Sequence, residues 1–407
     1  MSEWQHVAQE LEDAGLLLIQ DGNHGEYRPR PDEFDETGTM FIRAADMSGG
    51  TLKFDSAQKI NQTARARIRK GIGAPLDAIL SHKGTVGKVA FAPAGSPSFV
   101  CSPQTTFWRS LNHEVIDPRY LYNYLRSDPF ISQLRAIEHE SDMAAYVSLT
   151  QQRRLKVTVP PIVVQRSISG LLGVLDDKIA VNERIATVSL DLAKASYLSA
   201  NPSRLRTIGD LAQVFDGPHA TPKKVTGGPW FLSISSLQGG ILELSESAHI
   251  SEDDFPNWTR RVQPLNGDVL FSYETRLGEA ALMPSDIRAC LGRRMALLRS
   301  ADPQVSGALL LHAFLGNSFQ EEIKRRTIHG ATVDRIPLKE LPNWPMLLPP
   351  TETLGSLSTA LSSFHRSIEH AKRESQTLAT LRDTLLPQLM SGRLRVKDAE
   401  KIVEDHT

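Results

Sequence analysis

The chain has 407 residues, of which 40% are hydrophobic and 23% charged, and its formal net charge is -1 at pH 7. This length predicts two or more domains, because a single hydrophobic core seldom serves more than about 250–300 residues. Cys101 and Cys290 are the only cysteines, which excludes a disulfide scaffold and a four-cysteine zinc site, and no apolar run approaches the ~20 residues of a membrane-spanning helix.

Charge and the N-terminal residues bear on the compartment and the class of partner. Residues 1–15 carry acids early and lack the basic-then-apolar order of a signal peptide, so together with the scarcity of cysteine we expect a cytoplasmic protein. A duplex binder usually has a surplus of Lys and Arg, which the net charge does not show. The basic residues are nevertheless clustered, as in KINQTARARIRK (59–70), although such runs are more often plain solvated surface.

In chain order, residues 1–160 are expected to form a compact α+β domain. The run 77–92 is strand-rich and punctuated by glycine and proline, whereas 118–138 has a helical pattern. A long amphipathic helix is predicted over 161–200, ended by Pro202, with Asn182 as a polar residue on its seam. Its apolar residues recur at Ile168, Leu171, Leu172, Leu175, Ile179, Ile185 and Leu192.

The same succession then follows again. Residues 201–350 contain a strand-rich run at 268–283 and a helical stretch at 305–326, which predicts a second α+β domain. In 351–407 a second long helix is predicted to end at Pro387, and the two helices are expected to pair antiparallel, because neither apolar seam would be stable in water alone. The alternative is that each helix is merely the last element of its own domain. The second seam comprises Leu354, Leu357, Leu361, Phe364, Ile368, Ala371, Leu378 and Leu385.

An internal repeat of about 190 residues supports this organisation. Asp21-Gly22-Asn23-His24 corresponds to Asp216-Gly217-Pro218-His219, and each half closes with a double proline, at 160–161 and 349–350. Matched blocks in one order indicate a duplicated unit of domain and helix. The further matched residues are Asp77 with Asp268, Ser81 with Ser272, and Gly87 with Gly278.

A compact domain, a proline pair and a long helix, written twice, resemble the specificity (S) subunit of type I restriction–modification systems. GTVGKVAFAP (84–93) resembles the glycine-rich strand of the family's target-recognition domains. VPPIVVQRSISGLLGVLDDKI (159–179) resembles the start of its central helix, and LRDTLLPQLMSGRLRV (381–396) its C-terminal close. The second half departs from the pattern, with TRLGEAALMP (275–284) at the glycine-rich strand and no glutamine after its proline pair.

The resemblance implies an α+β fold in which two tandem target-recognition domains, 1–160 and 201–350, are separated by two long antiparallel coiled-coil helices, 161–200 and 351–407. Each domain would read one half of a bipartite duplex DNA site, and the helices would set the unread spacer. They would also dock two modification subunits, which hold S-adenosylmethionine and methylate adenine, and two restriction subunits could join. No cofactor is expected in this chain, and no membrane partner.

The matched loops, the glycine hairpin and the basic run are the candidates for DNA contact, because phosphates are bound by Lys, Arg and backbone amides while sequence is read at base edges. Asp-Gly is also ordinary turn chemistry, and a twisted hairpin needs glycine for its own geometry. The candidates are His24, Arg28, Arg30, Arg65, Arg67, Arg69, Lys83 and Lys88 in the first half, and His219, Lys223, Lys224, Tyr273 and Arg276 in the second.

Enzymatic motifs are missing. The proline pairs read VPPI and LPPT, without the polar residue before and the aromatic residue after that an adenine methyltransferase needs. GTVGK lacks the spacing of a phosphate-binding loop, and no H-E-x-x-H or G-x-S-x-G motif occurs. A non-catalytic subunit is therefore expected; the alternative is a coiled-coil adaptor of another complex, which would have no reason to place basic loops at equivalent positions in both halves.

Overall fold

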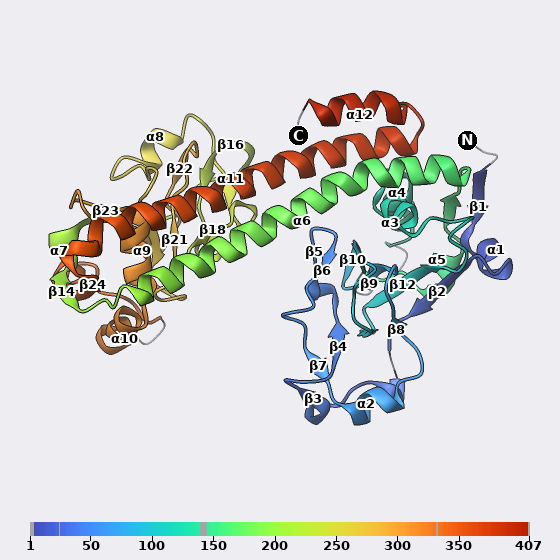
Figure 1. The fold of residues 1–407 in the computed structure, drawn as a ribbon, viewed down its shortest axis with the longest axis horizontal. Helices are drawn as coiled ribbons and strands as arrows, with labels where there is room; N and C mark the ends of the chain where they lie inside the picture. Colours follow the sequence, from blue (N-terminus) through green and yellow to red (C-terminus); the bar gives the residue numbers. More distant parts are fainter. Residues whose placement is uncertain (1–3, 24, 139–144, 331–332, 406–407) are drawn as a thin grey trace. The chain divides into compact units, whose positions relative to one another are not determined.

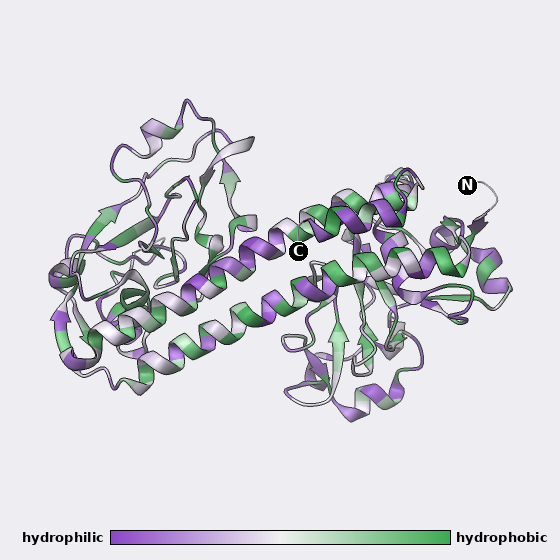
Figure 2. Ribbon diagram, turned by 45° about the horizontal axis from the view of Figure 1, so that its top comes forward, coloured by the Kyte–Doolittle hydropathy of each residue, from purple (hydrophilic) through white to green (hydrophobic). Residues whose placement is uncertain are grey.

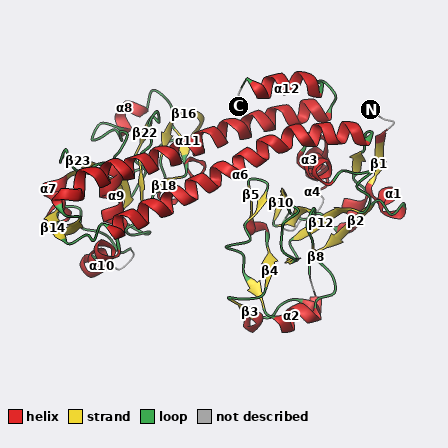
Figure 3. Cartoon of the chain, viewed as in Figure 1, coloured by secondary structure: helices red, strands yellow, loops and turns green. Residues whose placement is uncertain are grey.

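The structure is a computed structural model that describes residues 4–23, 25–138, 145–330 and 333–405. Contacts divide the chain into two compact units, unit 1 (1–179 and 377–407) and unit 2 (180–376), and the division falls inside both long helices. Helices and sheets occur together in each unit, which confirms the predicted α+β class (Figure 1, Figure 3).

Unit 1 contains a six-stranded sheet of order β2-β12-β9-β10-β6-β5, a five-stranded sheet of order β3-β7-β4-β11-β8, and the pair β1-β13. The strands are β1 Gln5–Val7, β2 Leu17–Asp21, β3 Phe34–Asp35, β4 Thr39–Ile42, β5 Met47–Ser48, β6 Thr51–Leu52, β7 Lys59–Ile60, β8 Ile72–Gly73, β9 Ala78–Lys83, β10 Thr85–Phe91, β11 Phe99–Cys101, β12 Thr105–Ser110 and β13 Lys156–Thr158. The helices are α1 Ala8–Asp13, α2 Gln62–Arg67, α3 Pro118–Arg126, α4 Asp128–Glu138, α5 Leu149–Arg153 and α12 Val396–Glu404.

Unit 2 contains a four-stranded sheet of order β15-β23-β20-β21, a three-stranded sheet of order β19-β16-β22, and the pairs β14-β24 and β17-β18. The strands are β14 Arg204–Thr207, β15 Ala212–Asp216, β16 Val225–Phe231, β17 Leu237–Gln238, β18 Ile241–Leu242, β19 Ala248–His249, β20 Val269–Ser272, β21 Ala280–Leu282, β22 Ala289–Cys290, β23 Met295–Ser300 and β24 Pro345–Leu348. The helices are α7 Ile208–Leu211, α8 Phe255–Trp258, α9 Gly307–Leu315 and α10 Asn317–Arg326.

The repeat seen in the sequence is a repeat of topology. The order β2-β12-β9-β10 in unit 1 reappears as β15-β23-β20-β21 in unit 2, and in both units a helix pair follows, α3 with α4 and α9 with α10. Each predicted helical stretch is broken once, at Ser127 and at Gly316, where the backbone is extended. Gly87 and Gly278 both have positive φ, as expected of glycines at matched places in a twisted hairpin.

Aromatic side chains contact one another within the largely aliphatic core of each unit. Trp108, Tyr124 and Phe130 are buried together in unit 1, and Phe271 and Phe314 in unit 2. Burying a side chain of this size contributes roughly 1.5–3 kcal/mol, so these clusters fix the helix pairs on their sheets.

The two long helices begin directly after the proline pairs, as predicted: α6 spans Ile162–Ser199 and α11 spans Thr351–Met390. Asn201 (φ 50°) follows the end of α6 in a left-handed conformation, before Pro202. The prediction that Pro387 ends the second helix is wrong, because Pro387 lies inside α11. The helix continues to Met390, and Gly392 (φ 70°) follows its end in a left-handed conformation; Pro387 removes only its own N–H hydrogen bond, so the last turn can still form.

Within each unit the two helix segments pack antiparallel. In unit 1, Asp176 of α6 pairs with Arg382 of α11 (Oδ1–Nη1 2.7 Å). In unit 2, the buried Asn182 donates from Nδ2 to Glu374 Oε2 (2.7 Å), and Tyr197 at the far end of α6 donates to the carbonyl of Leu347 just before α11 begins (2.8 Å). Asn182 is thus a polar seam residue, as the spacing predicted.

The buried seam of α6 in unit 2 differs from the predicted one. Ile185 and Leu192, expected on the seam, are 41% and 48% exposed, whereas Ala186, Ser189 and Ala193 are buried. The apolar residues that the spacing assigns to one seam therefore lie on two different faces of α6. Hydrophobic residues accordingly recur on more than one side of α6 (Figure 2). We call the exposed set the α6 apolar stripe: Val181, Ile185, Val188 and Leu192.

The start of α6 is tied to the compact part of unit 1 by a buried glutamine. Gln165 donates from Nε2 to the carbonyls of Pro160 (2.6 Å) and Val115 (2.8 Å), and its Oε1 accepts from the backbone N–H of Asp117 (2.9 Å). Ser169 on the next turn donates to Asp117 Oδ1 (2.7 Å). In unit 2 the place after the proline pair is taken by the buried Leu354, so this link is specific to the first copy.

None of the helices within the described residues combines the length and the apolar character that crossing a lipid bilayer requires.

Candidate nucleic-acid interface

The Asp-Gly loops are built alike in the two units. In unit 1, β2 ends at Asp21, and a Cβ at Gly22 would lie 1.8 Å from the carbonyl oxygen of Ser102. In unit 2, β15 ends at Asp216, and a Cβ at Gly217 would lie 2.5 Å from the carbonyl oxygen of Met295. Each glycine is therefore required by close approach of two backbones, and each loop leaves its sheet at a fixed point.

In unit 1 the loop after Asp21 carries two of the predicted contacts on the surface. Arg28 and Arg30 are exposed, and His24 lies outside the described residues. Arg67 of α2 makes a bidentate ion pair with Glu33 (2.6 and 2.7 Å) and donates to the carbonyl of Arg28 (3.2 Å). The hydrogen bonds from Arg67 and from the backbone N–H of Arg30 lower the pKa of the Glu33 carboxyl to about 2. Arg67 thus holds the loop in place.

The other basic candidates of α2 are more accessible. Arg65 is half-buried and Arg69, just after the helix, is exposed. Gly71 lies against the Asp-Gly loop, since a Cβ there would be 2.6 Å from the backbone nitrogen of Asn23. The basic run therefore ends beside the loop that carries Arg28 and Arg30.

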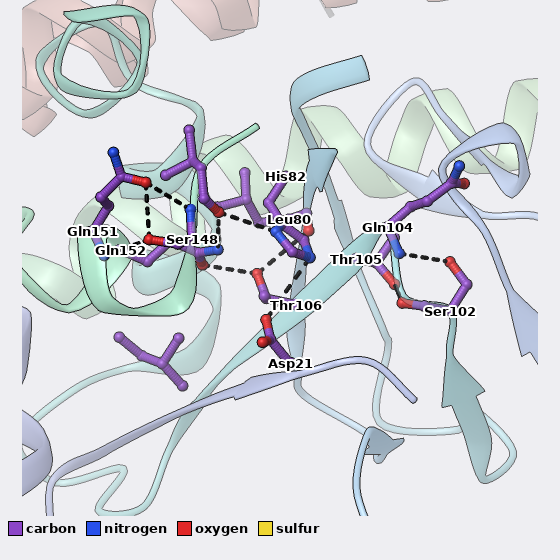
Figure 4. A network of polar contacts seen from close by, with 12 residues as sticks. Asp21, Leu80, His82, Ser102, Gln104, Thr105, Thr106, Ser148, Gln151 and Gln152 are labelled. Carbon is purple, nitrogen blue, oxygen red and sulfur yellow. Dashed lines mark hydrogen bonds and ion pairs between the residues drawn. The ribbon is translucent and has the colours of Figure 1, made fainter. Parts of the chain in front are cut away.

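Beneath this loop, the ends of β2, β9 and β12 carry a polar network (Figure 4). His82 is buried, with Nδ1 3.0 Å from the carbonyl of Val147 and Nε2 3.8 Å from Asp21 Oδ1. Gln152 of α5 accepts from Thr106 Oγ1 (2.9 Å) and from the indole N–H of Trp108 (3.2 Å). These bonds fix the sheet edge from which the loop emerges.

Lys83 and Lys88 project from the glycine hairpin, and both are exposed. The Lys83 ammonium lies 5.9 Å from the ring centroid of Tyr146, and Lys88 Nζ donates to the carbonyl of Ala44 (3.3 Å). Each amine keeps further donors that a phosphate could accept from.

In unit 2 the structure brings His219 and Tyr273 together. The Tyr273 hydroxyl lies 3.3 Å from His219 Nδ1, and His219 Nε2 lies 3.1 Å from Asp216 Oδ2. Tyr273 is only 5% exposed, and burial raises the pKa of its hydroxyl. Tyr273 therefore supports His219, whose own side chain is largely exposed.

Backbone pairing shows which residue of unit 1 occupies the place of Tyr273. The carbonyl of Tyr273 accepts from the N–H of Ile336 (2.9 Å), as the carbonyl of His82 accepts from the N–H of Val147 (2.9 Å). His82 is thus the counterpart of Tyr273. The two units place different side chains at the same point of the sheet.

The remaining candidates of unit 2 differ in exposure. Lys223 and Lys224 are exposed just before β16. Arg276 is half-buried, pairs with Glu279 (3.4 Å) and donates to backbone carbonyls, including that of Ile234 (3.4 Å). Arg276 is therefore anchored on one side.

Two arginines beside the second loop are not among the contact residues predicted from the sequence. Arg260 and Arg261 follow α8 and line a pocket of about 580 Å³ together with His219 and Trp258. Arg261 Nη1 lies 3.5 Å from Asp216 Oδ2 and 3.3 Å from the carbonyl of Gly217. The signal available in the sequence was positional, because Arg260-Arg261 stands at the same distance before Asp268 as Arg69-Lys70 stands before Asp77.

Within the described residues, no group of three or more His, Cys, Asp or Glu side chains is arranged to hold a metal ion.

Two curated proteins resemble this chain in sequence. The provisionally named type I restriction enzyme MjaX specificity subunit of Methanocaldococcus jannaschii is 23% identical over 389 residues, covering 89% of each chain. The type I restriction enzyme MjaIX specificity subunit of the same organism is 19% identical over 345 residues, covering 78% of this chain and 79% of that protein. No protein-family profile matches the chain.

Among solved structures, the S subunit of a type I restriction–modification system from M. genitalium has a similar fold. The TM-score is 0.56 at 12% sequence identity, and the alignment covers 95% of each chain. The resemblance predicted from the sequence motifs is thereby confirmed in sequence and in fold.

Proposed function

We propose that this chain, which has the fold of type I restriction–modification specificity subunits and resembles them in sequence, is the non-catalytic DNA-reading subunit of such a system. The observation that carries the proposal is the duplication: two units share one sheet order, and in each the same strand end leads into an Asp-Gly loop with basic side chains beside it. A bipartite duplex site presents two separate half-sites, and a duplicated reader matches that need.

In this proposal the compact parts, 1–160 and 201–350, each read one half-site, and the helices at 161–200 and 351–407 set the number of unread base pairs between them. Two readers on one frame gain from effective concentration only when their spacing matches the DNA. Phosphates would be bound by the exposed basic side chains of both units, including Arg28, Arg30, Lys83, Lys223 and Lys224.

The α6 apolar stripe is proposed as part of the docking face for the modification subunits. Val181, Ile185, Val188 and Leu192 follow helical spacing with exposures of 41–53%. Contiguous exposed apolar residues at this spacing suit the apolar face of a partner helix. The partners would be two modification subunits, which supply S-adenosylmethionine and adenine methylation, and two restriction subunits.

Long-read sequencing of the native genome, scoring N6-methyladenine with and without this gene, tests the proposal. Loss of one split motif with a fixed gap would support it and would reveal both half-sites. An unchanged methylome, with the partner methyltransferase expressed, would overturn it in favour of a coiled-coil adaptor.

Exchange of residues 1–160 for the equivalent part of a relative tests the division of labour. One half-site should change and the other should stay. A change in both half-sites would show that the two domains do not read independently.

A further inference from the structure

The pocket beside the second Asp-Gly loop has the side chains of a base-reading site. Its lining includes Trp258, Arg260, Arg261 and His219, so two guanidinium groups and two aromatic rings meet the same open space of about 580 Å³. Guanidinium groups are the commonest readers of base edges in the DNA major groove. Neither arginine is accounted for by the loops and hairpins that the sequence analysis singled out.

Arg261 is oriented by two long polar contacts before any ligand arrives. One side of its guanidinium faces Asp216 Oδ2 (3.5 Å) and the carbonyl of Gly217 (3.3 Å), while the side chain remains 58% exposed. Asp216 is itself fixed at the end of β15, and His219 approaches the same carboxylate oxygen (3.1 Å). Pre-orientation of this kind is what a specificity contact requires, because a reading side chain must be held close to its productive geometry.

The neighbouring Asp216 carboxylate favours a neutral base edge over a phosphate as the group that Arg261 contacts. A phosphate bound to this guanidinium would lie close to Asp216, and two negative charges a few ångströms apart repel each other. The N7 and O6 atoms of guanine are neutral acceptors and meet no such repulsion. The remaining N–H groups of the guanidinium fork match that pair of acceptors.

We propose that Arg261 reads a guanine edge in the half-site of unit 2, with Asp216 as its positioning residue, and that the adjacent Arg260 contacts a phosphate. This inference rests on the proposed function and names a specificity-determining residue within it. Arg260 is exposed, and none of the ion pairs among the described residues includes it, so it is suited to an anionic partner.

Unit 1 offers a parallel for the phosphate contact. Arg69 and Lys70 occupy the corresponding place before Gly71, which lies against Gly22 and Asn23 of the first loop. Both basic side chains are exposed. A basic pair thus stands beside the Asp-Gly loop in each unit, as two half-sites of one duplex would require.

The test uses the chain in complex with its modification subunits. Once the methylome has given the half-sites, binding is measured on duplexes that carry each base in turn at each position of the unit 2 half-site. Arg261→Ala should weaken binding to the preferred duplex about ten- to hundredfold and abolish the preference for G·C at one position, since that is the discrimination a bidentate contact provides. Arg261→Gln, a milder change, should lose the same guanine preference.

Arg260→Ala should weaken binding to all these duplexes by one common factor and reduce the salt dependence by about one phosphate contact. Arg288→Ala is the matched control, because Arg288 lies in the same unit, is also 58% exposed and is also paired with a carboxylate, that of Glu252. It should leave the base preferences unchanged.

A uniform loss of affinity with Arg261→Ala, or unchanged base preferences, would overturn the guanine assignment. The proposed function would stand in either case, provided that deletion of the gene still removes the split motif. Retained recognition of the unit 1 half-site shows that the variant chain is folded and assembled.

Discussion

Arg109 of β12 and Asp77, the residue directly before β9, form a bidentate ion pair in unit 1, with Nε–Oδ1 at 2.7 Å and Nη2–Oδ2 at 2.8 Å. The pair Arg299 and Asp268 repeats this geometry in unit 2, at 2.9 and 2.7 Å. In both units the aspartate also accepts a backbone N–H three residues before it. The same bonding in both units gives the matched pair Asp77 and Asp268 a structural role, and it adds Arg109 with Arg299 to the matched residues of the repeat.

Arg109→Ala is expected to lower the free energy of unfolding by about 2–4 kcal/mol, because it leaves the fully buried carboxylate of Asp77 without its charged partner. Urea denaturation of the full chain measures the change. Arg299→Ala should behave alike in unit 2, whereas Arg395→Ala, which removes an exposed pair with Asp398, should have little effect. A loss below about 1 kcal/mol for Arg109→Ala would show that the buried pair is not a stabilising feature.

Gln165→Leu copies into the first helix the residue that the second copy has at Leu354. It should destabilise the chain by about 2–4 kcal/mol, because it leaves the Asp117 N–H and the carbonyls of Pro160 and Val115 without their side-chain partner. Denaturant unfolding checks this. Ser167→Ala on the exposed side of the same helix serves as the control, and equal stability of both variants would contradict the proposed link.

The long helices were predictable because the residues that mark their starts are adjacent to them in the sequence. Each begins after a proline pair, and most of the predicted α11 seam residues are buried, including Leu354, Leu361 and Leu378. The face of α6 was not predictable, since the buried seam continues through Ala186, Ser189 and Ala193 while larger apolar residues lie outside it. Periodicity measures where apolar residues recur; it does not identify which of two apolar faces meets a partner.

The candidate interface was predictable only where the repeat matched residue types. The Asp-Gly loops emerged because both copies keep the glycine that close backbone approach demands. Arg261 was not predicted, because its role depends on its contact with Asp216, which is 45 positions earlier in the chain and adjacent only in the fold. The sequence predicts Tyr273 as a contact residue, whereas in the fold its side chain is buried and its hydroxyl lies beside His219.

Stability of unit 2 should fall at mildly acidic pH because of two buried histidines. His312 and His365 face each other with Nε2 atoms 3.0 Å apart, and Lys194 is the nearby charge on α6. Burial lowers the pKa of His312 to about 3 and that of His365 to about 4, so both are neutral at pH 7. Below the ordinary histidine pKa of about 6.5, the unfolded chain binds protons that the folded chain does not bind at these two histidines. The stability that is present above that pH is therefore lost as the pH falls toward 4.

The expected loss is up to about 1.4 kcal/mol per pH unit for each imidazole. Urea midpoints measured from pH 7.5 to 4.5 should fall more steeply for the natural chain than for the double variant His312→Leu, His365→Leu. Parallel profiles for the two proteins would rule out the histidine pair as the origin of the acid sensitivity.

Docking of the proposed modification subunit should depend on the exposed α6 apolar stripe. Ile185→Asp with Val188→Asp places two charges on side chains that are 41% and 48% exposed, so the fold should tolerate them while an apolar partner helix should not. We expect the variant to keep its helical circular dichroism and to lose at least tenfold in affinity for the modification subunit, measured by titration calorimetry. Thr187→Asp, on the same helix turn and exposed but outside the stripe, is the matched control and should bind normally. Unaltered binding by the stripe variant would move the docking face elsewhere on the chain, since two buried charges in an apolar helix contact cannot be accommodated without cost.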